Sequence, residues 1–302
     1  MSIHGIIKTL VLSGLNTRSK SGLLPPMAFG TRIPKIIHQT YLSKELPPAI
    51  EANIELICRM NPGWEYRFYD DADIATFIAA NYGVHILQYY ERINARCGAA
   101  RADLFRYLLM YKTGGVYLDI KSSLELKLDT VIREDDTFLL CNWNIRAEEN
   151  YYGGGQHFEL RHMPAGEYQQ WHITAAPGHP FLRAVIGNVL ANIDTYNPGL
   201  HGVGKHGVIR LTGPIAYSRA IFPLLTLYPH RFAHSGEELG FKYSIYAGKG
   251  ESSHKALFNT HYSVLEESII NLKPGRKIVA SLLGAVKKLY KSLAGHAQNM
   301  SS

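Results

Sequence analysis

A helix, a two-glycine turn and a short strand follow one another between residues 99 and 121, and this succession constrains the fold more than any other part of the chain. Leu104, Leu108 and Tyr111 recur at helical spacing in a stretch without proline or glycine. Gly114-Gly115 then ends the helix, because glycine is common just past a last helical turn, and an apolar strand follows over 116–120. A helix that leads directly into a strand indicates an α/β fold.

Other segments repeat this alternation. We expect strands over 33–38, 64–69, 137–141 and 241–246, and helices over 71–81, 84–93 and 180–193. The segment 199–207 contains several glycines and two histidines, and we interpret it as a loop. The order of these segments is that of an α/β protein.

Composition excludes several classes of protein. The chain has 302 residues, of which 46% are hydrophobic and 19% charged, and this is typical of a folded protein with one large or two small domains. Three cysteines are too few for a disulfide framework or a zinc cluster, and they fit a reducing compartment. No apolar run approaches the ~20 residues that cross a bilayer. We therefore expect neither a fibre, nor a disulfide scaffold, nor a membrane-spanning protein.

A formal net charge of +7 favours anionic partners, and basic residues crowd the end of the chain. We divide the sequence into a loosely attached leader (1–30), a main domain (31–275) and a basic amphipathic helix (276–302). This helix either lies on an anionic membrane surface or packs its apolar stripe on the main domain. No basic and aromatic motif for nucleic acid is evident, so we expect no nucleic-acid partner.

Two carboxylates and two cations gather around the helix–turn–strand unit. Asp103 and Arg106 are three residues apart and project from one face of the predicted helix. Asp119 ends the following strand, and Lys121 lies beside it if the extended conformation continues. In open α/β folds, ligands bind at the carboxyl ends of the strands. The alternative is two ordinary ion pairs at the surface, which contribute little.

The amino-acid sequence of this unit favours a ligand-binding site over ordinary surface ion pairs. Residues 102–107 read ADLFRY and residues 114–119 read GGVYLD. Together they closely resemble the donor-site signature of glycosyltransferase family 32, which includes the yeast initiating α-1,6-mannosyltransferase and bacterial capsule and lipopolysaccharide enzymes. The stretches 33–41, 61–66, 171–180 and 212–214 are similar to other blocks of the family. The resemblance runs from about residue 33 to residue 262.

The resemblance implies a fold of the GT-A type, in which a mixed, mainly parallel sheet lies between helices and holds a nucleotide sugar. Family members retain the configuration of the donor sugar, so the expected reaction is the retaining transfer of a hexose from a UDP- or GDP-sugar. Asp103 and Arg106 would bind hydroxyls of the donor sugar, with Tyr117 in the same site. A carboxylate and a guanidinium can together fix one orientation of a sugar.

The opening strand of the family lines the pocket for the base of the nucleotide. On this resemblance, Gln39, Thr40 and Tyr41 would line that pocket, with the Tyr41 ring stacked on the base. Trp171 and His172 would form a wall for the acceptor, because aromatic faces pack on sugar rings. A place for Trp171 in the core remains open at this point.

The sequence departs from the family at the metal-binding motif. Asp119 resembles the first aspartate of the family's Asp-x-Asp motif, which contacts the ribose and a divalent cation, Mn²⁺ or Mg²⁺, but Lys121 replaces the second aspartate. An ammonium group has no lone pair for a metal. Either Asp119 still holds a metal with help from a late residue such as His261, or Lys121 itself neutralises the diphosphate.

Two functions follow from the resemblance. The first is a glycosyltransferase that extends a glycan or a lipid-linked oligosaccharide, in the cytoplasm and in peripheral contact with the inner membrane face. The second is a catalytically silent homologue that binds a nucleotide sugar or a glycan. Lys121 is the residue that motivates the second hypothesis.

Overall fold

The computed structural model describes residues 18–143, 156–246 and 267–272. Both His261 and the predicted helix over 276–302 lie outside these ranges. No helix among the described residues is long and apolar enough to cross a membrane.

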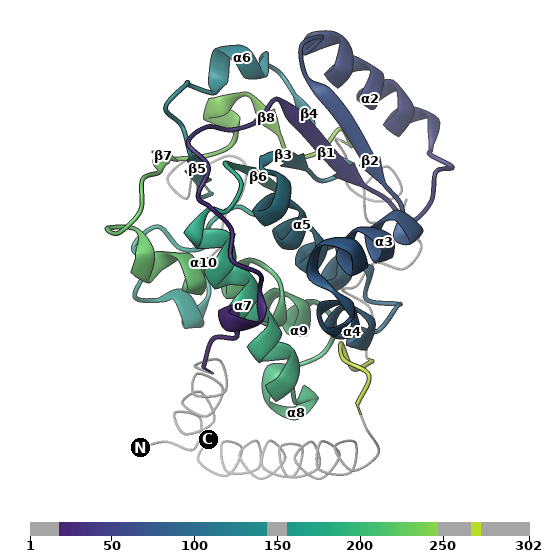
Figure 1. Ribbon diagram of the computed structural model, residues 1–302, viewed down its shortest axis with the longest axis vertical. Helices are drawn as coiled ribbons and strands as arrows, with labels where there is room; N and C mark the ends of the chain where they lie inside the picture. The colour runs from purple at the N-terminus through teal and green to yellow at the C-terminus, as the bar shows by residue number, and fades with distance from the viewer. Residues whose placement is uncertain (1–17, 144–155, 247–266, 273–302) are drawn as a thin grey trace, which may run out of the picture.

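A six-stranded mixed sheet forms the centre of the protein (Figure 1), with the strand order β2-β1-β3-β6-β5-β7. Its strands are β1 (Ile36–Thr40), β2 (Glu65–Tyr69), β3 (Gly115–Leu118), β5 (Phe138–Cys141), β6 (His172–Ala175) and β7 (Arg231–Ala233). Strand β1 pairs in parallel with β2 and β3, and β5 pairs in parallel with β7. Strand β6 is antiparallel to both β3 and β5. A separate two-stranded sheet joins β4 (Ser123–Leu124) to β8 (Phe241–Lys242).

The helices lie on both sides of this sheet. They are α2 (Pro48–Met60), α3 (Asp71–Tyr82), α4 (Val84–Arg92), α5 (Gly98–Thr113), α6 (Leu128–Val131), α7 (Pro180–Thr195), α8 (Pro198–His201), α9 (Gly204–Leu211) and α10 (Pro214–Ile221). Alternate residues of β3 enter two different cores, because side chains on a strand alternate between its faces. Tyr117 packs with α5 and α7, whereas Val116 and Leu118 pack with α2 and α6. The predicted α/β class, with a sheet between helices, is confirmed.

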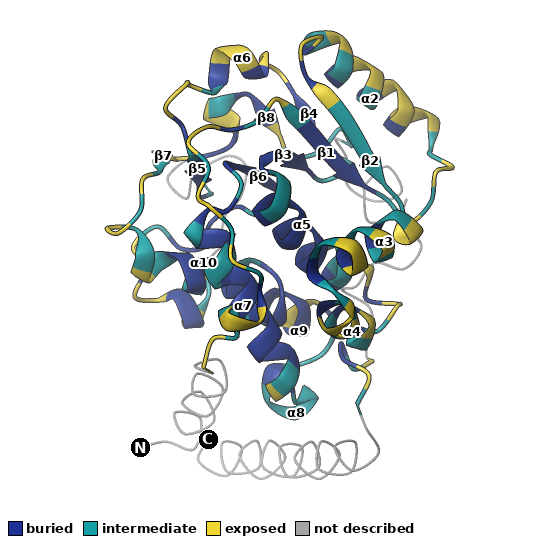
Figure 2. Ribbon diagram, viewed as in Figure 1, coloured by how far each residue is buried: buried dark blue, intermediate teal, exposed yellow. Residues whose placement is uncertain are grey.

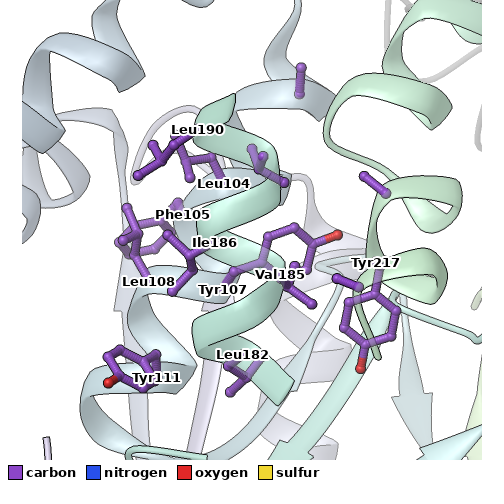
Figure 3. Close-up of a cluster of buried hydrophobic side chains, with 14 of the residues drawn as sticks. Leu104, Phe105, Tyr107, Leu108, Tyr111, Leu182, Val185, Ile186, Leu190 and Tyr217 are labelled. Carbon is purple, nitrogen blue, oxygen red and sulfur yellow. The ribbon is translucent and has the colours of Figure 1, made fainter. Parts of the chain in front are cut away.

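Helix α5 lies in the larger core and is buried on all sides (Figure 2). Every residue from 103 to 111 is buried, and a helix without a solvent face belongs in the middle of a domain. Figure 3 shows its side chains against those of α7: Leu104, Phe105, Tyr107, Leu108 and Tyr111 face Leu182, Val185, Ile186 and Leu190. The two charged residues of this buried stretch, Asp103 and Arg106, therefore need polar partners.

Most predicted elements are confirmed to within a few residues, among them α3, α4, α5, α7, β2 and β5. The first strand begins later than predicted, at Ile36, and the last one covers only β8. The expected loop over 199–207 is wrong, because α8 and most of α9 occupy it. Pro198 starts α8, the Asn197 side chain accepts a hydrogen bond from the Gly199 N–H, and Gly202 at φ +89° separates the two helices.

The leader is not loosely attached over its described part. The Lys20 N–H donates to the Gly187 carbonyl at 3.0 Å, and the Gly30 N–H donates to the Pro177 carbonyl at 2.8 Å. The Leu24 side chain lies in the larger core. Residues 18–30 therefore pack on the main domain, and the division at residue 30 stays a prediction.

Gly115 allows β3 to approach β1 closely. Its φ is +104°, and a Cβ atom there would lie 2.5 Å from the Ile36 carbonyl oxygen. We expect Gly115→Ala to lower the free energy of unfolding by about 2 kcal/mol or more, measured by urea denaturation. Gly63→Ala is the control, because a Cβ at Gly63 meets no atom within 4 Å. Equal effects of the two substitutions would contradict this explanation.

Candidate functional site

The carboxyl ends of β1 and β3 lie side by side, and they bring the predicted site residues together. The two strands are parallel, with Ile37 opposite Val116, so the residues that follow them share one edge of the sheet. The Gln39 Nε2 donates to the Asp119 carbonyl at 3.1 Å and fixes the two strand ends to each other. The Gln39 Oε1 accepts a hydrogen bond from the Tyr66 hydroxyl at 3.0 Å.

Asp103, Arg106, Asp119 and Lys121 form a row of alternating charges at this edge, which we call the charge row. The Arg106 guanidinium lies between the two carboxylates, 3.3 Å from Asp103 Oδ1 and 3.0 Å from Asp119 Oδ1. The Lys121 Nζ lies 3.4 Å from the other Asp119 oxygen, Oδ2. The exposed fraction rises from 4% at the Asp103 side chain to 20% at the Asp119 side chain. The charge row thus runs from the core toward solvent and is neutral as a whole.

Arg106 is held in place by neutral groups as well as by the carboxylates. Its Nη1 donates to the Gln170 carbonyl at 2.8 Å, and its guanidinium lies 4.9 Å from the centre of the Tyr117 ring. Burial lowers the pKa of Arg106, but Asp119, Tyr117 and Asp103 outweigh it and the pKa is raised. The Tyr117 ring therefore packs against the Arg106 guanidinium. The predicted contact of Tyr117 with a donor sugar stays a prediction.

Asp103 forms the inner end of the charge row. Its Oδ2 accepts from the Thr212 hydroxyl at 2.8 Å, and its Oδ1 accepts from the Gln170 Nε2 at 3.2 Å. Burial raises the pKa of Asp103, and Arg106 and these hydrogen bonds oppose that shift. Both carboxylate oxygens are already used, so in this structure Asp103 positions Arg106. The predicted contact of Asp103 with the donor sugar stays a prediction.

Lys121 lies in a turn rather than in the extended strand that we expected. The Ser122 N–H donates to the Asp119 carbonyl at 2.8 Å and closes this turn. The predicted proximity of Lys121 to Asp119 is nevertheless present. The Lys121 Nζ also lies 4.4 Å from the centre of the Tyr243 ring, and the Lys121 carbonyl accepts from the Ile245 N–H at 2.8 Å.

The described residues do not fit a divalent cation. Both oxygens of Asp119 face cationic side chains, whereas Mn²⁺ and Mg²⁺ need several oxygen ligands. Within the described ranges, no three His, Cys, Asp or Glu side chains gather closely enough to hold a metal ion. His261, the other predicted ligand, falls outside those ranges. We derive no chemical step through a metal.

The residues predicted for the base pocket lie beside the charge row. The Thr40 hydroxyl donates to the Tyr69 carbonyl at 2.9 Å, and the Tyr41 N–H donates to the same carbonyl at 3.2 Å. Tyr41 is half-buried. Burial raises the pKa of Tyr246, and the charge of Tyr41 adds to that shift. Stacking of Tyr41 on a base stays a prediction.

Trp171 and His172 lie beneath the site, not on its surface. The Trp171 carbonyl accepts from the Asp119 N–H at 2.8 Å, and its ring packs 5.4 Å from the Tyr243 ring. The His172 ring stacks on Phe241 at 4.6 Å, and burial lowers the pKa of His172 to about 3. Both side chains are at most 4% exposed. This placement does not support the predicted acceptor wall, because the packing of the core already covers both rings.

Three residues that support the charge row were not among the predicted site residues: Gln170, Thr212 and Tyr243. Thr212 and the segment after Gln170 belong to stretches that resemble the family, so the sequence held a signal for that region. Tyr243 lay in a predicted strand, and nothing in the sequence marked it as a partner of Lys121. Their contacts become visible only in three dimensions.

One family model matches part of the chain that contains the site. Residues 47–138 match the family model described as a glycosyltransferase sugar-binding region containing the DXD motif. The match includes all four residues of the charge row. The resemblance to this glycosyltransferase family that the sequence predicted is confirmed for this region.

Several of the curated relatives are mannosyltransferases of yeasts by their names. The chain is 34% identical over 157 residues to inositol phosphoceramide mannosyltransferase 3 of Schizosaccharomyces pombe, covering 52% of this chain and 37% of the relative. It is 24% identical over 169 residues to the initiation-specific alpha-1,6-mannosyltransferase of Saccharomyces cerevisiae, covering 46% of this chain and 35% of the relative. The matched region thus spans well under half the length of either relative.

Two solved structures are also similar. The PaToxG glycosyltransferase has a TM-score of 0.46 and 16% identity, covering 74% of this chain and 77% of that chain. The UDP-bound glycosyltransferase domain from the YGT toxin has a TM-score of 0.44 and 9% identity, covering 76% of this chain and 82% of that chain.

A double-mutant cycle tests the buried half of the charge row. We expect Arg106→Met alone to lower the free energy of unfolding by about 3 kcal/mol or more, because it leaves two carboxylates without their shared cation. In the double variant with Asp103→Asn, the loss should be smaller than the sum of the single losses by about 1–3 kcal/mol. Urea denaturation measures both quantities.

The control cycle uses an ion pair at the surface. Arg67 and Glu65 are 2.7 Å apart, and their side chains are 37% and 56% exposed. Arg67→Met and Glu65→Gln should couple much more weakly, because water screens them. Equal coupling in the two cycles would show that the buried pair has no special role.

Proposed function

We propose that the chain is a retaining glycosyltransferase that moves a hexose from a nucleoside diphosphate sugar to a hydroxyl group of a glycan or a lipid-linked acceptor. The observation that carries this proposal is the charge row at the carboxyl ends of β1 and β3, inside the region that matches the glycosyltransferase family. In α/β sheets this edge is where ligands bind. Two fixed cations at such an edge suit the negative charge of a diphosphate.

Mannose is the hexose that we propose first. Both yeast relatives described above are named as mannosyltransferases, and the name of one of them gives inositol phosphoceramide as its acceptor. A lipid-linked acceptor would also suit the basic helix predicted over 276–302, which lies outside the described residues. The place of action that we propose is therefore the cytoplasmic face of a membrane.

In the proposed reaction the acceptor attacks from the side of the leaving group. The bond between the anomeric carbon and the phosphate oxygen breaks, and its electron pair stays on the diphosphate. The acceptor oxygen bonds to the same carbon, and the acceptor proton passes to the released diphosphate oxygen. Lys121 and Arg106 are the described cations nearest to this edge, and they would stabilise the charge that develops there.

This route needs no carboxylate nucleophile, and the structure offers none with free oxygens in the charge row. Asp103 is bonded by Thr212 and Gln170, and Asp119 has a cation at each oxygen. A carboxylate in such surroundings is a weak nucleophile, because its charge is already stabilised. Both aspartates are therefore assigned to positioning the two cations.

Release of sugar and of nucleoside diphosphate from a panel of UDP- and GDP-hexoses tests the function. We expect turnover of one donor, a GDP- or UDP-mannose in the first instance, and a loss of at least ~100-fold in Asp119→Asn. Asp135→Asn is the matched control, since Asp135 is exposed and outside the charge row. Tight binding of a donor without any turnover would instead identify the catalytically silent homologue that Lys121 suggests.

A further inference from the structure

We propose that the ammonium group of Lys121, and not a divalent cation, neutralises the diphosphate of the donor. The proposal rests on the function proposed above and names the group that recognises the phosphates. It predicts a nucleotide site that works in the absence of metal. The described residues around Asp119 give three reasons.

The first reason is that Lys121 holds the place where a cation would have to bind. Its Nζ lies 3.4 Å from Asp119 Oδ2, while Arg106 takes Oδ1 at 3.0 Å. A divalent ion on this carboxylate would displace one of these cations and then lie close to the other. Like charges at such distances repel strongly in a partly buried site. The site therefore favours the lysine over a metal.

The second reason is that Lys121 is fixed in position before any ligand binds. Its ammonium lies over the Tyr243 ring at 4.4 Å, and its carbonyl accepts a hydrogen bond from the Ile245 N–H. The Ser122 hydroxyl donates to the Tyr243 carbonyl at 2.9 Å and ties the turn to the segment after β8. A lysine that is already ordered loses little entropy when it binds phosphate.

The third reason is the balance of charge within the charge row. The Asp119 carboxylate lies 3.4 Å from the Lys121 Nζ and favours the charged form of the lysine. An ammonium has three hydrogen-bond donors, and Asp119 takes one. When a phosphate accepts from another of these donors, Arg106 continues to neutralise Asp119. The Lys121 side chain is 14% exposed, more than the 6% of the Arg106 side chain.

Titration calorimetry of UDP and of GDP, in EDTA and in Mn²⁺, tests the proposal on the full chain. We expect one nucleotide to bind wild-type protein with a Kd that differs by less than about twofold between the two conditions. Lys121→Ala should weaken binding at least ~10-fold in both. Lys127→Ala is the matched control, because Lys127 is exposed and lies outside the charge row, and it should bind like wild type.

Lys121→Asp sharpens the test because it exchanges the cation for a metal ligand. This variant should bind the nucleotide only in Mn²⁺. If wild-type binding vanishes in EDTA and returns with Mn²⁺, the inference is wrong and the proposed transferase stands. If neither nucleotide binds under any condition, both proposals are wrong. The comparison of EDTA with Mn²⁺ on wild-type protein needs no substitution. It therefore tests whether the nucleotide site requires a metal even if Lys121→Ala fails to fold.

Discussion

The buried guanidinium of Arg106 is the interaction on which the site depends. It joins a carboxylate from its own helix to the carboxylate that follows β3, and thereby fixes the end of the strand to the buried helix α5. Burying these charges costs free energy unless each one is paired and hydrogen-bonded. Gln170 and Thr212 supply the hydrogen bonds that complete the arrangement. Without them the inner carboxylate would have Arg106 as its one charged partner among the described residues and no hydrogen bonds from Gln170 and Thr212.

Because of this arrangement, the tightly packed core also fixes the side chains at the edge of the sheet. Helix α5 is packed on all sides, so Arg106 has little freedom to move. The ion pair with Arg106 and the hydrogen bond from Gln39 hold Asp119 in place. Lys121 in turn lies between Asp119 and Tyr243. A set of fixed charges of this kind can stabilise a developing negative charge without reorganising first.

Local sequence predicted the elements and much of the site, but not the contacts that complete it. The helical spacing before Gly114-Gly115 located α5 and β3, and the spacing of Asp103 and Arg106 placed them on one face. The partners from Gln170 and Thr212 are 64 and 109 residues away from Arg106 and Asp103, respectively. No local pattern encodes such distances. The sequence left both a core and an acceptor wall open for Trp171, because an aromatic ring suits either, and only the fold shows that Trp171 is buried.

A crystal structure of the chain with a nucleoside diphosphate tests the central claim most directly. The claim is that the charge row is the diphosphate site and that Lys121 is its outermost cation. We predict phosphate oxygens within about 4 Å of the Lys121 Nζ, with Arg106 still between Asp103 and Asp119. A diphosphate bound away from the carboxyl ends of β1 and β3, or held there by a metal ion with Lys121 turned aside, would contradict it.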